Sequence, residues 1–346
     1  MRASSRRVID GENRRDGFTR AYTRLIVRIV TFSIVARDPE TNDLGVAVAS
    51  KFLGAGAVVS HVQAGAGAIA TQALANYSYG PNGLKLLEQG LSAQETIDRL
   101  TADDDGRDHR QLGVVDASGR AATYTGSSCI DWAGGRTADG IAVQGNILDG
   151  PRVVDAMLEA FHQAGVPFAE RLVNALKAAD ANGGDRRGRQ SAALLIVRDK
   201  GGYGGNNDRW IDLRVDDDPS PMDKLAHLLE LTHLYRDRPR AEELIALDEN
   251  VARELQQRLA AAGYSPQTIS GKKGLAAVME DLGVERTGEP RATPSGWTDE
   301  WESALAEWMS VENLEERMTA RGWVDPRVVD HLRRSTDAAP SERAVG

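Results

Sequence analysis

The stretch TFSIVARDPETNDLGVAVASK, residues 31–51, decides the fold of this chain. Residues 31–37 alternate as a half-buried strand does, and turn-forming residues fill positions 38–43. Residues 44–51 then return as a second strand, so the stretch predicts an antiparallel β-hairpin. On the first strand, one face carries Phe32, Ile34 and Ala36, and the other carries Thr31, Ser33, Val35 and Arg37.

Strands and helices alternate in groups along the next part of the chain. Further strands are expected near residues 57–63, 66–71, 111–116, 121–125, 141–144, 191–197 and 209–215. Helices are expected at residues 83–89, 92–100, 150–163, 167–180 and 218–235. Strands that cluster in hairpins, with helices grouped between them, indicate antiparallel sheets covered by helices. The predicted class is therefore α+β: a four-layer αββα sandwich over residues 31–235, followed by a small, mostly helical C-terminal domain.

Length and composition exclude several classes of protein. The chain has 346 residues, which is enough for two domains. No apolar run approaches the roughly 20 residues that a membrane-spanning helix needs, so no membrane partner is expected. The single cysteine, Cys129, allows no internal disulfide and fits a reducing cytoplasm. The sequence has no zinc-type Cys/His cluster and no phosphate-cradling glycine loop, so neither a metal nor another cofactor is expected.

Charge is spread unevenly along the chain. The first 30 residues carry eight arginines and three acids, a net charge of +5, so the remainder carries −9 − 5 = −14. Nucleic-acid binding depends on a basic surface, and residues 31–346 are too acidic to indicate one. No nucleic-acid partner is therefore expected.

Residues 1–30 form an Arg-rich extension without the uninterrupted apolar core of a secretory signal. The extension is interpreted as a propeptide or as the product of a mis-assigned start. Val30 could correspond to a GTG initiation codon that the cell reads as methionine. Removal of that methionine would leave Thr31 as the mature N-terminus.

Thr31 at a free N-terminus would be a candidate nucleophile. A threonine hydroxyl is weakly nucleophilic until a base removes its proton. The α-amine of the same residue can be that base, because its ordinary pKa of about 7.7–8.0 lies close to neutral pH. An amide nitrogen has no basic lone pair, so this chemistry requires the free amine.

Lys51 is the second candidate catalytic residue. If the cross-strand partners in the hairpin have residue numbers that add to 82, Lys51 lies directly opposite Thr31. It would then share that face with the small residues Gly45, Ala47 and Ala49. An ammonium group there would favour the neutral form of the α-amine and could stabilise developing negative charge. The alternative is a solvated lysine at a strand end, and a register shift of one residue would undo the argument.

Long motifs in the first domain resemble a known family. They are residues 31–39, 45–52, 70–76, 79–81, 109–116, 143–148, 184–192, 202–205 and 208–217. Together they resemble the N-terminal-nucleophile (Ntn) hydrolase-like family called domain of unknown function 1028, over residues 31–235. Members of that family usually begin Met-Thr-Phe-Ser-Ile, and Val30 stands here in place of the methionine. The resemblance implies the αββα fold and supplies no settled substrate.

Other polar residues are candidates for the same site. Asn146 is a candidate oxyanion donor, and an ordinary turn asparagine is the alternative. Arg187 could bind a substrate carboxylate, although a salt-bridge network with Asp185 explains that loop as well. The full set of candidate substrate-binding residues is Ser33, Gln72, Asn76, Asp185, Arg187 and Asn206.

The C-terminal part, residues 238–335, shows a weaker resemblance to a peptidoglycan-binding-like module, and residues 336–346 are expected to be a disordered tail. The resemblance rests on residues 255–259, 263–264, 301–308, 313–317 and 325–326. A chain without an export signal fits peptidoglycan poorly. A helical interaction or oligomerisation domain is therefore the default expectation, with a homo-oligomer as the expected assembly.

Three functions follow as hypotheses. The leading one is an Ntn amidohydrolase that cleaves a non-peptide or small-peptide amide bond of a small molecule through Thr31. The alternative from another class is a non-catalytic protein that binds a small metabolite on an Ntn-like scaffold. A cell-wall-associated protein led by its C-terminal module is the third.

Overall fold

A computed structural model describes residues 31–269, 283 and 285–337 of the chain. The predicted extension 1–30 and residues 338–346 of the predicted tail lie outside the described residues. The chain divides into two compact units, the first ending at Leu229 and the second beginning at Glu230. Each unit has its own hydrophobic core.

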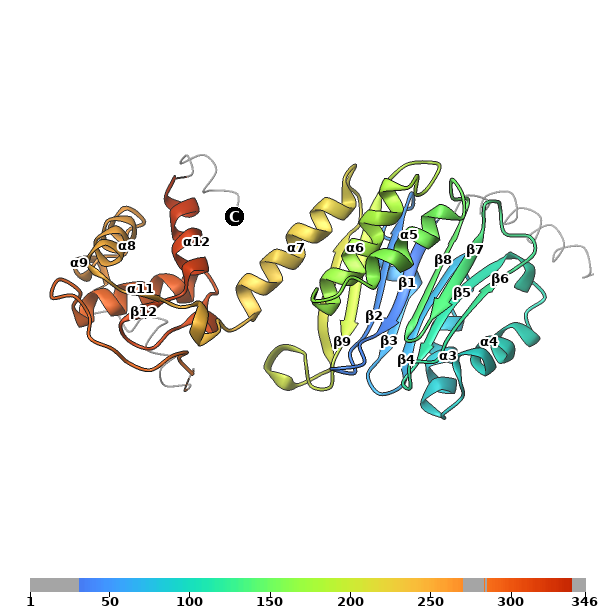
Figure 1. Cartoon of the computed structure of the whole chain (residues 1–346), viewed down its shortest axis with the longest axis horizontal. Helices are drawn as coiled ribbons and strands as arrows, with labels where there is room; N and C mark the ends of the chain where they lie inside the picture. The colour runs from blue at the N-terminus through green and yellow to red at the C-terminus, as the bar shows by residue number, and fades with distance from the viewer. Residues whose placement is uncertain (1–30, 270–282, 284, 338–346) are drawn as a thin grey trace, which may run out of the picture. The chain divides into compact units, whose positions relative to one another are not determined.

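The predicted hairpin lies at the centre of a six-stranded antiparallel sheet in the first unit (Figure 1). Its strand order is β10-β9-β2-β1-β8-β7. The strands are β1 (Thr31–Arg37), β2 (Leu44–Ser50), β7 (Gly134–Ala138), β8 (Ile141–Asn146), β9 (Ser191–Val197) and β10 (Arg209–Val215). Strand β1 therefore pairs with β2 on one side and with β8 on the other.

A second, four-stranded antiparallel sheet has the order β3-β4-β5-β6. Its strands are β3 (Ser60–Gln63), β4 (Gly67–Ala73), β5 (Arg110–Asp116) and β6 (Ala121–Thr125). The inner faces of the two sheets meet in an apolar core that includes Val35, Val46, Val48, Ala68 and Val115.

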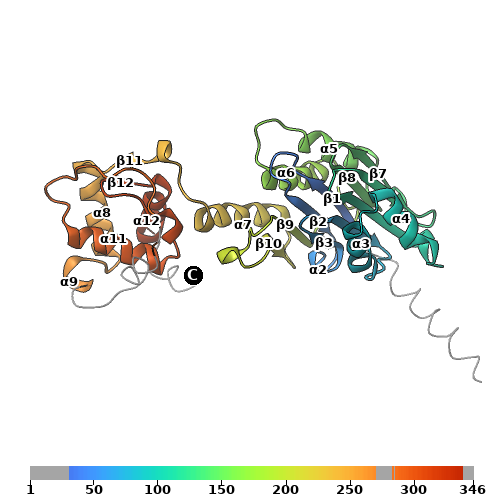
Figure 2. The ribbon, with the colours of Figure 1, turned by 90° about the horizontal axis from the view of Figure 1, so that it is seen from below.

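Helices cover both outer faces, as Figures 1 and 2 show. Helices α5 (Arg152–Phe161), α6 (Phe168–Ala181) and the first part of α7 (Pro221–Arg236) pack on the six-stranded sheet. Helices α3 (Tyr79–Glu88) and α4 (Ala93–Ala102) pack on the four-stranded sheet. Ser92 and Glu95 form the expected capping box at the start of α4. The predicted four-layer αββα sandwich is confirmed.

The register of the central hairpin differs from the prediction. Thr31 pairs with Ser50 and Arg37 pairs with Leu44, so paired residue numbers add to 81. The turn sets this register, because the Asp38 N–H donates to the Asp43 carbonyl oxygen at 2.9 Å and closes the loop. Lys51 therefore does not oppose Thr31, and the prediction that it does was wrong.

The small residues of β2 also lie on the opposite face from the one predicted. Ala47 and Ala49 join the core beneath the helices, together with Phe32. A Cβ atom at Gly45 would come within 2.7 Å of Leu172 Cδ1, so the glycine lets α6 approach the sheet closely. These small side chains accommodate helices and do not line a cleft on the face of Thr31.

Two further elements differ from the prediction. The segment expected as one strand at 57–63 begins as a short helix, α2 (Gly56–Val59), and continues as β3. The edge strand β7 was not predicted, because its sequence Gly-Gly-Arg-Thr-Ala has neither the apolar alternation nor the bulk that marks a strand.

The second unit is small and mostly helical, as expected. After the end of α7, its described residues form the helices α8 (Glu249–Ala261), α9 (Pro266–Ile269), α11 (Asp299–Val311) and α12 (Pro326–Asp337). Strands β11 (Ile245–Ala246) and β12 (Trp323–Val324) form a two-stranded sheet. The core includes Trp297, Trp308 and Leu255. Helix α12 continues through Asp337, two residues into the segment expected to be a disordered tail.

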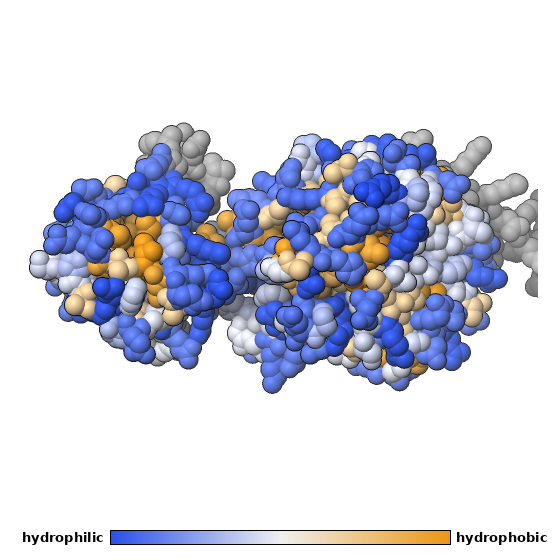
Figure 3. Space-filling view, viewed as in Figure 1, coloured by the Kyte–Doolittle hydropathy of each residue, from blue (hydrophilic) through white to orange (hydrophobic). Residues whose placement is uncertain are grey.

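The face of the first unit seen in Figure 3 is mostly hydrophilic, with apolar side chains gathered over α5 and α6. Among the described residues, no helix is long and apolar enough to cross a membrane.

Candidate active site

Thr31 lies at one end of β1 on the face that meets the four-stranded sheet, and it is fully buried. Its cross-strand partners are Ser50 on β2 and Asn146 on β8. The Thr31 hydroxyl oxygen is 3.2 Å from the Ser50 hydroxyl oxygen. The Gln72 side-chain amide donates to the Thr31 carbonyl oxygen at 3.3 Å. Polar groups from three strands therefore surround this residue.

A buried network of amide side chains lies beside Thr31, between the sheets. Gln111 is its centre, because its Oε1 accepts from Gln72 Nε2 at 2.8 Å and from Asn146 Nδ2 at 2.9 Å. Its Nε2 donates to the Gly145 carbonyl oxygen at 2.7 Å. These bonds fix the orientation of the Asn146 amide next to Thr31. A side-chain amide carries two N–H donors, so one N–H of Asn146 can still serve an oxyanion.

Ser33 connects Gln72 with Gln144 in the same network. The Ser33 hydroxyl donates to Gln72 Oε1 at 2.6 Å and accepts from Gln144 Nε2 at 2.6 Å. A Cβ atom at Gly113 would come within 2.0 Å of Gln144 Oε1, so this glycine makes room for the glutamine between the sheets. Ser33 and Gln72 support the candidate site, and both are fully buried.

Asp185 anchors the loop that follows α6 to the same end of the sheet. Its carboxylate accepts the backbone N–H of Lys51 at 2.8 Å and that of Arg187 at 2.8 Å. The Arg187 guanidinium also binds it, with Nη2 at 3.1 Å from Oδ2. Asp185 is only 8% exposed, and these contacts hold the loop against the end of β2. The salt-bridge interpretation of this loop fits these contacts.

Two candidate residues lie apart from Thr31 or are held by other partners. Asn76 donates to Asp104 at 3.4 Å and accepts the Ser78 N–H at 3.1 Å, so it organises the start of α3. Asn206 lies in the loop between β9 and β10, beside the Leu44 end of β2. A strand of this length separates the two ends of the sheet by about 20 Å. Asn206 therefore cannot contact the same small substrate as Thr31.

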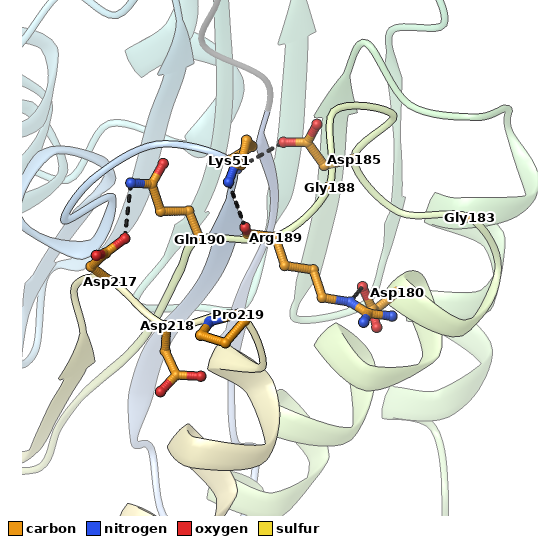
Figure 4. A pocket seen from close by; sticks show the side chains of 10 residues that line it. All are labelled: Lys51, Asp180, Gly183, Asp185, Gly188, Arg189, Gln190, Asp217, Asp218 and Pro219. Carbon is orange, nitrogen blue, oxygen red and sulfur yellow. Dashed lines mark hydrogen bonds and ion pairs between the residues drawn. The ribbon is translucent and has the colours of Figure 1, made fainter.

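A cavity of about 510 Å³ opens at the Thr31 end of the six-stranded sheet (Figure 4). The residues that line it are Lys51, Asp180, Gly183, Asp185, Gly188, Arg189, Gln190, Asp217, Asp218 and Pro219. Of the candidate residues, it includes Lys51 and Asp185. Ser50 lines a smaller hollow beside it that shares Asp180, Asp185, Gly188 and Arg189 with the cavity. Ser50, the last residue of β2, thus contacts the Thr31 hydroxyl, and Lys51, which follows it, lines the cavity wall.

The model of a family described as "Family of unknown function (DUF1028)" matches residues 31–225. This chain belongs to the DUF1028 family. The crystal structure of a DUF1028 protein from Silicibacter pomeroyi is similar, with 34% identity and a TM-score of 0.55 over 59% of this chain and 86% of that one. A second model, described as "Putative peptidoglycan binding domain", matches residues 271–332. None of the curated proteins matches the chain.

Other reactive side chains of this DUF1028 protein have structural partners. His61 packs against Gly80, where an added Cβ would lie 2.2 Å from the imidazole ring, and burial lowers the pKa of the histidine. Burial raises the pKa of the Cys129 thiol to about 11. Within the described residues, no group of three or more His, Cys, Asp or Glu side chains is arranged to hold a metal ion.

The sequence analysis of this DUF1028 domain missed Ser50, Gln111 and Gln144 as site residues. Each is a polar residue at a strand position that the structure buries. A buried polar residue in an otherwise apolar strand requires a hydrogen-bond partner, and that requirement was the available signal. The partner depends on strand register for Ser50 and Gln144 and also on how the two sheets stack for Gln111, and a single strand does not carry that information.

Proposed function

We propose that the DUF1028 domain of this protein is an Ntn amidohydrolase with Thr31 as its nucleophile. The observation that carries the proposal is the place of Thr31, at the end of the central strand β1 and between hydroxyl and amide side chains of β2 and β8. The substrate would be a small molecule with a non-peptide or small-peptide amide bond. The proposal requires a mature chain that begins at Thr31.

In the first half of the reaction, the Thr31 hydroxyl attacks the substrate carbonyl carbon while the α-amine of Thr31 accepts its proton. The resulting oxyanion takes a hydrogen bond from the Asn146 side chain, which Gln111 orients. The C–N bond then breaks, the α-amine returns the proton to the leaving nitrogen, and an acyl ester remains on Thr31.

In the second half, a water molecule attacks the ester with the same α-amine as base. The C–O bond to Thr31 breaks, the hydroxyl regains a proton, and the carboxylic acid leaves. Both halves need only one base, which is why the free amine matters more than any distant side chain.

The observed register changes the proposed role of Lys51. Its ammonium group donates to the Arg189 carbonyl oxygen at 3.1 Å and lines the cavity. A lysine acts on the α-amine only if it pairs directly with Thr31, and Ser50 holds that position. We therefore propose that Ser50 contacts the nucleophile and that Lys51 contacts the substrate.

The test compares four forms of the protein on a library of small amides. A chain that begins at Thr31 should hydrolyse at least one amide, and Thr31→Ala should reduce that turnover by at least about 1,000-fold. A chain with one extra residue before Thr31 should be similarly inactive, because it lacks the amine base. Thr31→Ser should retain measurable turnover. Turnover that survives in the Thr31→Ala form, or no turnover of any amide, would contradict the proposal.

The alternative remains a non-catalytic protein that binds a small metabolite on this scaffold. In such a protein, arginines of the segment 184–192 would bind the metabolite, but Arg187 pairs with Asp185 at 3.1 Å and Arg189 pairs with Asp180 at 2.7 Å. The alternative gains support if the mature protein keeps residues before Thr31.

For the C-terminal unit we propose an interaction or oligomerisation role, with peptidoglycan binding as the rival that the matched family model suggests. A pull-down of the full chain on purified peptidoglycan, compared with its mass in solution, separates the two. Cytoplasmic location remains part of the proposal.

A further inference from the structure

The cavity at the end of the six-stranded sheet carries separated charges of opposite sign. Figure 4 shows the side chains of Lys51 and Asp218 apart from each other, with Pro219 beside Asp218. Lys51 comes from the end of β2, whereas Asp217 and Asp218 come from the segment between β10 and α7. All three side chains border the same volume of about 510 Å³.

The other charges of the cavity wall are largely matched by partners. Arg189 pairs with Asp180 at 2.7 Å, and Asp185 pairs with Arg187 at 3.1 Å. These pairs leave Lys51 on one side and the two neighbouring aspartates on the other as the charges that a ligand would meet.

Among the described residues, the groups that donate hydrogen bonds to these two aspartates are neutral. Asp217 accepts from the Gln190 amide at 3.0 Å, and Asp218 accepts the Ser220 N–H at 2.7 Å. Such bonds position the carboxylates and leave their negative charge in place.

We infer that this cavity binds a small zwitterion of the amino-acid or dipeptide class. The ligand carboxylate would meet the Lys51 ammonium, and the ligand ammonium would meet Asp217 and Asp218. The volume lies within the range of about 300–1,000 Å³ typical of small-molecule sites. The link from this ligand to the substrate rests on the proposed function. The two sites are joined by neighbouring residues, because Ser50 at the end of β2 contacts the Thr31 hydroxyl and the next residue, Lys51, borders the cavity.

Calorimetry on the full chain with Thr31→Ala tests the inference without interference from hydrolysis. The probes are glycylglycine, N-acetylglycylglycine, which lacks the ammonium, and glycylglycinamide, which lacks the carboxylate. Glycylglycine should bind about tenfold more tightly than either derivative, as expected for one charge-assisted contact at each end.

Variants assign the two ends of the site. Lys51→Met should reduce the affinity for glycylglycine about tenfold and leave that for glycylglycinamide unchanged. Asp217→Asn with Asp218→Asn should weaken glycylglycine equally and leave N-acetylglycylglycine unchanged. The exposed residues Lys85 and Asp105 supply the matched controls Lys85→Met and Asp105→Asn, which should bind as the parent does.

Equal affinity for the three probes, no binding of glycylglycine at millimolar concentration, or indifference to the Lys51 and Asp217/Asp218 changes would overturn the inference. The proposed function fails separately, through the amide assay. Glycylglycine binding without hydrolysis of any amide would contradict the proposed hydrolase and support the zwitterion site. Thr31-dependent hydrolysis without selective binding of glycylglycine would support the hydrolase and contradict the zwitterion site.

Discussion

The hydroxyl groups of Thr31 and Ser50 face each other across the central hairpin, with 3.2 Å between their oxygens. The six-residue turn that follows β1 creates this pairing, because it makes the paired residue numbers add to 81. The residue beside the candidate nucleophile is therefore a neutral hydroxyl, and the lysine that follows it belongs to the cavity.

Ser50→Ala tests that relationship through turnover. The loss of one hydrogen bond to the reacting hydroxyl should reduce kcat about tenfold with little change in KM. Lys51→Met should instead raise KM, because Lys51 borders the cavity. The control is Ser118→Ala at an exposed position, which should change neither kcat nor KM. A fall in kcat for Lys51→Met with an unchanged Ser50→Ala enzyme would restore the original role of the lysine.

Gln111→Met should destabilise the first unit by about 2–4 kcal/mol, because it removes hydrogen bonds from several buried amide groups. The groups affected are Gln72 Nε2, Asn146 Nδ2 and the Gly145 carbonyl oxygen. Urea unfolding measures the effect. The matched control is Gln94→Met, at an exposed position of α4. A loss no larger than that of the control would mean that the network contributes little to stability.

Asp104 should make stability depend on pH. Its hydrogen bonds from Arg110 and then from Tyr79 hold the pKa of its carboxyl well below the ordinary range. A lowered folded-state pKa stabilises the protein above the unfolded-state value of about 3.9, and this contribution is lost as pH falls towards the folded-state pKa.

Asp104→Asn should therefore cost about 1.5–3 kcal/mol at neutral pH, and its difference from the parent should shrink below about pH 4. The neighbouring Asp105→Asn, which is exposed, should show no such difference. Thermal unfolding across pH measures both, and a gap that is constant with pH would contradict the assignment.

In the second unit, Arg317 and Asp325 form an ion pair in which each side chain is 2% exposed. Arg317 also donates to the carbonyl oxygens of His233 and Leu234. Arg317→Met would leave a buried carboxylate unpaired, so unfolding of this unit should become easier by about 3–5 kcal/mol. Adding Asp325→Asn should recover part of the loss. Arg321→Met at a partly exposed pair is the control, and an equal effect there would refute the prediction.

Most elements of the first unit were predictable because their alternation or helical spacing is strong. The register of the hairpin was not, for a physical reason. Strand β2 is buried on both faces, with Val46 and Val48 between the sheets and Ala47 and Ala49 under the helices. A strand that is apolar on both faces gives no polarity contrast with which to choose its partner positions.

The candidate site was predictable only in part. Thr31, Ser33, Gln72 and Asn146 were identified, and the structure brings them together. Gln111 was missed because its partners come from β4 and β8, and only the stacking of two sheets brings these strands together. Asn206 was included on its loop composition, which says nothing about which end of a sheet a loop occupies.

The most direct test of the central claim is the N-terminal residue of the mature protein, isolated from its own cells and read by mass spectrometry. The account predicts a chain that begins at Thr31 with an unmodified α-amine, since only that form supplies the base. A mature chain that keeps residues before Thr31, or that carries a blocked amine, would contradict the Ntn mechanism and favour the binding protein.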